Sequence, residues 1–371
     1  MDNRPKILCK QASKRIDIID IIKGIAILSV VMGHALNTDV VGDPIVERIR
    51  RFVYVYHLPV FFWVAGYLHK KCSIKQFLKG LCINQYLKTT LVALASFLLL
   101  RLWVSLGVFP ELTRTEILSR IAMTLRYRPS GILTGALWFM TFYSIALSFY
   151  FLMELFVKSN WIRAVLLVFV GCVGVFFVEH EILNTYRINL ALSIQPVIHI
   201  GQLMRNRKPV METLKKLRFP IGIVSATIIV ILNHFTGLEI ELTKHEVYGM
   251  YGFYPVIFVG ITFVISFAYI IEGSILKNVI KLMGEGSFSI MALHLMAFKV
   301  VDAILGNVNN VGTDLTVSPI AFYSPQIRAV YVIVGTLLPL LIYLISTKAK
   351  TIWKNKSQQK KGVDKVKIQI L

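Results

Sequence analysis

Residues 15–34 have the sequence RIDIIDIIKGIAILSVVMGH, and apolar side chains dominate from residue 18 to residue 36. A run of this length and composition predicts a helix that crosses a membrane. The helix nevertheless carries Asp20, Lys23 and His34. A charge near the centre of a membrane helix costs about 2.5–3.5 kcal/mol on insertion scales, so we expect these side chains to face a protein interior or a water-filled cavity.

Lys23 and His34 are predicted to share one face of this helix. They are 11 residues apart, which at about 100° per residue is three turns plus about 20°. A rise of about 1.5 Å per residue separates them by about 16 Å along the helix axis. Asp20 lies one turn before Lys23 and can pair with it. One helix face therefore presents a paired cation near one side of the membrane and a histidine near the other.

The whole chain has the composition of a multi-pass membrane protein. Of its 371 residues, 56% are hydrophobic and 16% are charged, and the mean hydropathy is +0.65. Soluble domains are less apolar than this. We predict an all-α fold with about ten transmembrane helices. The expected spans are 18–36, 57–69, 89–108, 135–157, 161–178, 189–204, 219–235, 253–271, 286–305 and 329–347.

The basic residues indicate the orientation in the membrane. The net charge of +21 would suit a nucleic-acid partner, but the charges lie in short loops, so none is expected. With the N-terminus inside, the inner segments hold 28 Lys and Arg residues and the outer segments 10. This is the positive-inside pattern, and it places both termini in the cytoplasm. We expect a basic segment at 1–17, a transmembrane domain at 18–347 and a fraying basic tail at 348–371, in the inner (plasma) membrane.

Two further stretches lie near the predicted outer surface. Residues 44–56 are amphipathic, and they form either an interfacial helix or a lid on which Arg50 or Arg51 holds an anionic acceptor. His57 begins the short span 57–69, and it is either an interfacial residue or part of a site. Proline and glycine within that span predict a broken or tilted helix buried among others.

Cations after the second and within the third span are candidate binding residues. Lys75 and Lys79 belong to a lysine-rich inner loop. This loop either reflects topology alone or forms a phosphate-binding rim for an anionic donor from the cytoplasm. Arg101 lies within the third span, where it needs a partner or water, unless it extends to the outer surface.

Later segments offer three more candidates. Trp138 opens the fourth span on the outer side, where tryptophan is most often an interfacial anchor. Ser287 and His294 open the ninth span and are seven residues apart, so they share a helix face. A histidine at mid-membrane depth indicates function, although an interhelical hydrogen bond is an open alternative.

Local spacing also predicts two ion pairs. No motif in the chain indicates a bound metal or cofactor. Glu154 can reach Lys158 one turn away, and Lys299 can pair with Asp302. The chain shows no zinc-ligand spacing, phosphate-binding loop or dinucleotide fingerprint. We therefore expect neither a metal nor a bound cofactor.

The first helix resembles that of acyltransferase family 3, the integral-membrane O-acyltransferases, and within it the fucose 4-O-acetylase-like branch. That family has a basic residue, ten intervening residues and a histidine, which correspond here to Lys23 and His34. Residues 57–67, HLPVFFWVAGY, resemble the family's second-helix segment, with Ala65 where serine is usual. The segments that contain Trp138, and Gly284 with Ser287 and His294, resemble later family segments in the same order.

One family feature is incomplete in this chain. The family often carries two arginines three residues apart after its second helix. Lys79 and Cys82 are the nearest match here, so one cation is missing. Either Lys79 alone serves that role, or Lys75 or Lys88 substitutes.

The resemblance implies transfer of an acyl group, expected to be acetyl, from cytoplasmic acyl-CoA to a hydroxyl of a cell-surface or lipid-linked carbohydrate. Acyl-CoA would be the donor substrate, and the lipid bilayer and the glycan the other partners. His34 would act as a general base, for which neutral imidazole is suited, or would carry the acyl group itself. Lys23, positioned by Asp20, would orient the donor or stabilise an oxyanion.

Two other functions fit the intramembrane charges. The chain could be a transporter or exporter of polysaccharide units without acyl transfer, because such charges also mark substrate paths. It could also be a structural subunit of a glycan-assembly complex. Activity that depends on acyl-CoA would distinguish an enzyme from a transporter. Loss of activity on substitution of Lys23 or His34 would distinguish it from a structural subunit.

Overall fold

The computed structural model describes residues 16–36, 43–105, 111–128, 133–236, 242, 249–309 and 319–369. Every regular element within these residues is a helix, which confirms the all-α prediction. The elements are α1 (Asp17–Ala35), α2 (Pro44–Tyr54), α3 (Pro59–Leu68), α4 (Ile74–Lys79), η1 (Gly80–Leu87), α5 (Lys88–Ser105), α6 (Arg114–Leu125), η2 (Gly135–Leu137), α7 (Trp138–Phe156), α8 (Asn160–Glu179), η3 (Thr185–Arg187), α9 (Ile188–Ser193), α10 (Gln195–Arg205), α11 (Lys208–Lys216), α12 (Arg218–Thr236), α13 (Gly249–Glu272), α14 (Lys277–Glu285), α15 (Ser287–Asn309) and α16 (Pro325–Gln369).

Eight helical segments in the described part of the chain are long and apolar enough to cross a membrane. They begin at α1, α4, η2, α8, α12, α13, α15 and α16. The other two expected spans, 57–69 and 189–204, consist of shorter helices: α3 has 10 residues, and α9 and α10 together replace the second span. The protein is therefore a multi-pass membrane protein. One of its ten expected spans is a short helix, and another is divided between two short helices.

These two segments pack directly against each other. A Cβ atom added at Gly66 of α3 would lie 1.8 Å from the carbonyl oxygen of Ile198 on α10. One added at Gly201 would lie 2.1 Å from the carbonyl oxygen of Trp63. Small residues permit such close backbone approach between membrane helices. The prediction that the segment 57–69 is buried among other helices is thus confirmed, although α3 is one continuous helix and is not broken.

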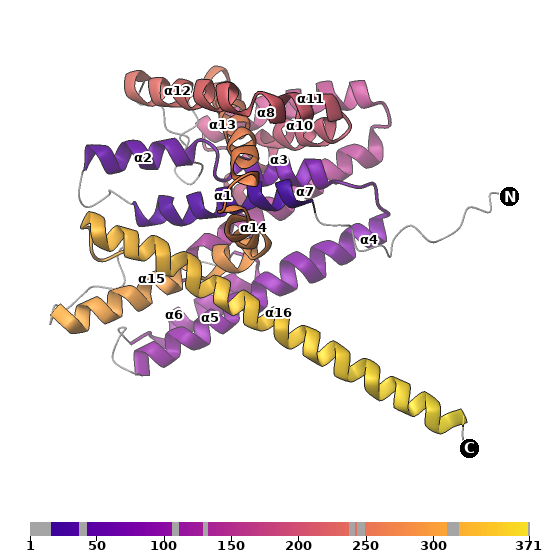
Figure 1. Ribbon diagram of the computed structural model, residues 1–371, viewed down its shortest axis with the longest axis vertical. Helices are drawn as coiled ribbons and strands as arrows, with labels where there is room; N and C mark the ends of the chain where they lie inside the picture. The colour runs from indigo at the N-terminus through magenta and orange to yellow at the C-terminus, as the bar shows by residue number, and fades with distance from the viewer. Residues whose placement is uncertain are drawn as a thin grey trace.

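The first helix lies at the centre of the bundle. In α1, 78% of the span is buried, the largest fraction among the eight segments. Its packing partners include α2, α3, α13, α14, α15 and α16, and Figure 1 shows it running through the middle of the molecule. The side chains that disfavour lipid are therefore carried by the helix that has least contact with lipid.

The first and last spans run antiparallel. Arg328, near the start of α16, donates to the carbonyl oxygen of Ala35 at the end of α1, at 3.3 Å. The start of α1 and the far end of α16 therefore lie on the same side, as predicted for the two termini (Figure 1). The tail was expected to fray after residue 347, but α16 continues to Gln369. Lysine, glutamine and alanine in this stretch are good helix formers, which explains the continuation.

Candidate active site

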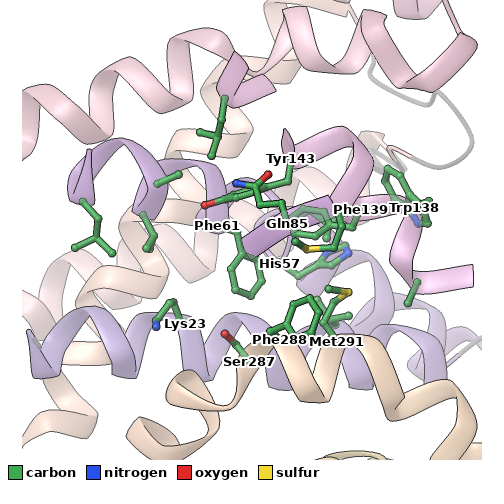
Figure 2. Close-up of a pocket in the computed structure, with 18 of the residues that line it drawn as sticks. Lys23, His57, Phe61, Gln85, Trp138, Phe139, Tyr143, Ser287, Phe288 and Met291 are labelled. Atoms are coloured by element: carbon green, nitrogen blue, oxygen red, sulfur yellow. The ribbon is translucent and has the colours of Figure 1, made fainter. Parts of the chain in front are cut away.

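A cavity of about 730 Å³ lies beside α1, within the size range of about 300–1,000 Å³ that is typical of small-molecule sites. It extends from Lys70 and Gln76 on the predicted cytoplasmic side to Arg50 and Trp138 on the predicted outer side. Figure 2 shows Lys23 and Ser287 on one side of the view and Trp138 on the other. Its polar and aromatic lining includes Lys23, His34, Arg50, Tyr54, His57, His69, Lys70, Gln76, Gln85, Trp138, Tyr143, Tyr150 and Ser287.

Lys23 and Asp20 form the ion pair that their spacing predicts. Lys23 Nζ lies 2.6 Å from Asp20 Oδ1. Asp20 is only 6% exposed, and its second oxygen, Oδ2, has no hydrogen-bond partner among the described residues. Removing the Lys23 charge would leave the buried Asp20 carboxylate without compensation, which is strongly destabilising.

Two glycines fix the position of this pair. A Cβ atom at Gly24 would lie 1.9 Å from the carbonyl oxygen of Ile280, and one at Gly284 would lie 1.7 Å from the carbonyl oxygen of Asp20. The backbones of α1 and α14 are therefore in direct contact beside Lys23. This contact explains physically why both positions are glycine.

His34 lines the cavity on the same face of α1 as Lys23. Its ring centroid lies 5.1 Å from that of His294 on α15. His294 is fully buried, and its Nδ1 lies 2.9 Å from the carbonyl oxygen of Ile290. Because a carbonyl can only accept, Nδ1 carries the proton. The Nε2 lone pair of His294 has no partner among the described residues.

The outer end of the cavity is formed by α2 and the first turn of α3. Arg50 is 6% exposed, and its Nη2 lies 2.9 Å from Oε1 of Glu47. Its guanidinium lies 5.0 Å from the ring centroid of Tyr54, and the Tyr54 and His57 rings are 4.6 Å apart. Arg50 thus points inward and lines the cavity, whereas Arg51 does not. The interfacial helix and the lid both stay open as interpretations of residues 44–56, with Arg50 as the arginine that lines the cavity.

Comparison with known proteins shows the family to which this chain belongs. A family model for an acyltransferase domain, acyltransferase family 3, matches residues 16–347. The chain belongs to this family of acyltransferases. No curated protein and no solved structure matches the chain. The family model does not separate branches, so the fucose 4-O-acetylase-like branch stays a prediction.

Five of the predicted candidates do not line the acyltransferase cavity: Asp20 and His294, which contact lining residues, and Lys75, Lys79 and Arg101. Lys75 and Lys79 are exposed on α4, and Lys70, before α4, lines the cavity instead. Gln76 lies on the same short helix and also lines the cavity, so the two lysines flank its cytoplasmic end. Arg101 is exposed on α5 and does not line the cavity.

Sequence reasoning missed a polar network at the cytoplasmic end of the cavity. Glu154 pairs with Nε2 of His69 at 2.6 Å, so the predicted pairing of Glu154 with Lys158 is wrong. Gln202 donates to Glu154 at 3.4 Å, and Tyr150 donates to Gln202 at 2.5 Å. His69 and Glu154 are 85 positions apart, so no local spacing could have indicated this pair.

The described residues contain no group of three or more His, Cys, Asp and Glu side chains that could hold a metal ion. A histidine, a paired lysine and a long cavity can bind an elongated substrate and move one proton.

Proposed function

We propose that this acyltransferase moves an acyl group, expected to be acetyl, from cytoplasmic acyl-CoA to a hydroxyl of a cell-surface or lipid-linked carbohydrate. The observation that carries the proposal is that one cavity contains His34 and Lys23 and extends towards both predicted membrane surfaces. A donor and an acceptor that arrive from opposite sides can meet in it. The plasma membrane is the proposed location, because acyl-CoA is then available on the inner side.

The proposed reaction requires a base at the acceptor hydroxyl. His34 accepts the hydroxyl proton while the hydroxyl oxygen attacks the thioester carbonyl carbon. A C–O bond forms, the C–S bond breaks, and the thiolate of CoA leaves with the proton returned by His34. An acyl-His34 intermediate would split the same exchange into two steps, and both routes use the same ring.

His294 supports His34 in this proposal. Its Nδ1 proton is held by the carbonyl oxygen of Ile290, and its ring centroid lies 5.1 Å from that of His34. A buried ring held in one orientation restricts the rotamers open to the catalytic imidazole beside it. We assign His294 as a positioning residue, because it is buried behind His34 and does not line the cavity.

Lys23 is assigned to the donor. The separation of about 16 Å from His34 along α1 is too large for contact with the carbonyl that the acceptor attacks. A cation at that distance suits the extended arm of acyl-CoA, with Asp20 holding it in place. Lys70 lines the cytoplasmic end, and the exposed Lys75 and Lys79 would attract the phosphates of CoA there.

The test uses the full-length protein in lipid nanodiscs with acetyl-CoA labelled in the acetyl group. Mass spectrometry of surface glycans from cells with and without the gene identifies the acceptor fraction for the assay. His34→Ala should lower the rate of acetyl transfer by about 10²–10⁴, with unchanged membrane insertion. Wild-type transfer by His34→Ala would overturn the assignment, and acetyl-CoA-independent glycan export would favour a transporter.

A further inference from the structure

A second cavity, of about 430 Å³, lies beside the first. It is formed by the end of α6, the start of α7 and the connection from α8 to α9, all on the predicted outer side. Trp138 lines both cavities. Trp138 therefore forms part of the wall between the two cavities.

The wall of the second cavity combines cations with aromatic rings. The guanidinium carbon of Arg128 lies 5.3 Å from the ring centroid of Tyr186, and that of Arg187 lies 5.5 Å from the centroid of Trp138. Stacking on a ring orients a guanidinium, and Nη1 of Arg187 also donates to Oδ1 of Asn184 at 3.5 Å. The Arg128 side chain makes no hydrogen bond or ion pair with the described residues, and none of the nine described lining residues has a carboxylate.

The two arginines are close enough to affect each other. Burial, and secondly the charge of Arg128, lower the pKa of Arg187 from its ordinary value. Both guanidiniums nevertheless stay protonated, because arginine is charged at any physiological pH. Two like charges at a cavity whose described lining residues include no carboxylate create a positive potential that attracts an anion.

The backbone around this cavity is held in an unfavourable conformation. Tyr127, Tyr186 and Arg187 have φ values of 59°, 57° and 59°, in the left-handed region that costs non-glycine residues about 1–3 kcal/mol each. They are three of the five such residues in the described chain. Thr141 donates to the carbonyl oxygen of Tyr127 at 2.5 Å, which holds one of them in place. Strain of this kind concentrates at ligand-binding sites.

We propose that the second cavity binds the anionic group of an acidic saccharide acceptor and so selects acceptors that carry a carboxylate or a phosphate. Guanidinium forks match both groups through paired N–H donors, and Asn184 and Thr185 add polar groups suited to sugar hydroxyls. The sugar next to the bound anion would reach past Trp138 towards His34. This inference rests on the proposed function and deepens it by naming the acceptor class.

The test measures binding to the full-length protein in nanodiscs by calorimetry. One probe is a tetrasaccharide of alternating glucuronic acid and N-acetylglucosamine, and its control is the same tetrasaccharide with reduced carboxyl groups. Glucose 1-phosphate and glucose form a second pair, which separates a carboxylate from a phosphate as the preferred anion. We expect the charged member of at least one pair to bind at least about tenfold more tightly.

Arg128→Gln should abolish this preference. Arg126→Gln is the matched control, because Arg126 is exposed in the same turn and does not line the cavity. Equal affinity for charged and neutral probes, an equal loss in both variants, or equally tight binding of inorganic phosphate alone would overturn the proposal.

Transfer assays separate this inference from the proposed function. His34→Ala should lose acetyl transfer and keep the preference for the charged probe. If no acetyl transfer is found with any acceptor while the Arg128-dependent preference persists, the proposed function fails and the anion site stands. If transfer proceeds and Arg128→Gln uses acidic acceptors as well as the wild type does, the anion site fails and the proposed function stands.

Discussion

The contact between Gly24 and Gly284 gives a sharp test of how α1 is positioned. A methyl group at Gly284 would lie 1.7 Å from the carbonyl oxygen of Asp20, whereas ordinary contacts begin at 3.4 Å. The neighbouring atom is backbone, so no rotamer change can relieve the clash. Gly284→Ala would therefore require α14 to move away from α1 by about 1.7 Å at this point.

That movement has two expected consequences. Overpacking of this kind costs about 1–3 kcal/mol of stability. A displacement of about 1 Å at a positioned group can cost about 10²-fold in rate, so we expect Gly284→Ala to lower acetyl transfer by roughly that factor. Gly24→Ala should act in the same way, through the carbonyl oxygen of Ile280. Because a single movement of α14 away from α1 relieves both clashes, the double variant should lose less stability than the two single variants added together.

The assay compares initial rates of acetyl transfer and thermal unfolding in nanodiscs. Gly222→Ala is the matched control, because its added methyl group would meet only Ser266 Cβ at 3.5 Å, an ordinary contact. It should keep the rate and stability of the wild type. Wild-type rate and stability in both Gly24→Ala and Gly284→Ala would refute the argument that this contact sets the position of Lys23.

Further predictions concern residues around the cavity. His294→Asn should lower turnover by roughly tenfold or more, but less than the loss of the base itself at about 10²–10⁴, and it should shift the pH–rate profile. Glu154→Gln should destabilise the protein by about 1–3 kcal/mol in thermal unfolding, because it breaks the 2.6 Å pair with His69. Lys75→Ala with Lys79→Ala should raise KM for acetyl-CoA in a salt-dependent manner and leave kcat unchanged, because exposed charges act through screened attraction. A fall in kcat in the Lys75→Ala, Lys79→Ala variant would contradict the assignment of these lysines to attraction of the donor.

Several features were predictable because they depend on local periodicity. The common face of Lys23 and His34 follows from 100° per residue, and both side chains line one cavity. The spacing of three residues predicted the pair of Lys299 with Asp302, which the structure confirms at 2.8 Å. Hydropathy alone indicated the all-α membrane fold. In each case, one helix contains all the information needed.

Other features depend on contacts between distant segments. The carboxylate of Glu154 pairs with His69 instead of a neighbour on its own helix, because α3 and α7 meet at the cavity. Arg101 was a site candidate because it lies within a predicted membrane span. Its side chain is exposed on the surface of α5 instead. The second cavity depends on left-handed backbone at Tyr186 and Arg187, which nothing in their residue types indicates.

Cysteine accessibility tests the central claim that Lys23 and His34 face one aqueous cavity. The native cysteines are replaced by serine, and Lys23→Cys, His34→Cys and Ile22→Cys are treated in nanodiscs with a charged methanethiosulfonate reagent. Ile22 is fully buried one position from Lys23, so it is the matched control. We predict reaction at positions 23 and 34 at least about tenfold faster than at position 22, with acetyl-CoA slowing the reaction at position 23. Equal rates at all three positions, or no reaction at 23 and 34, would contradict the account.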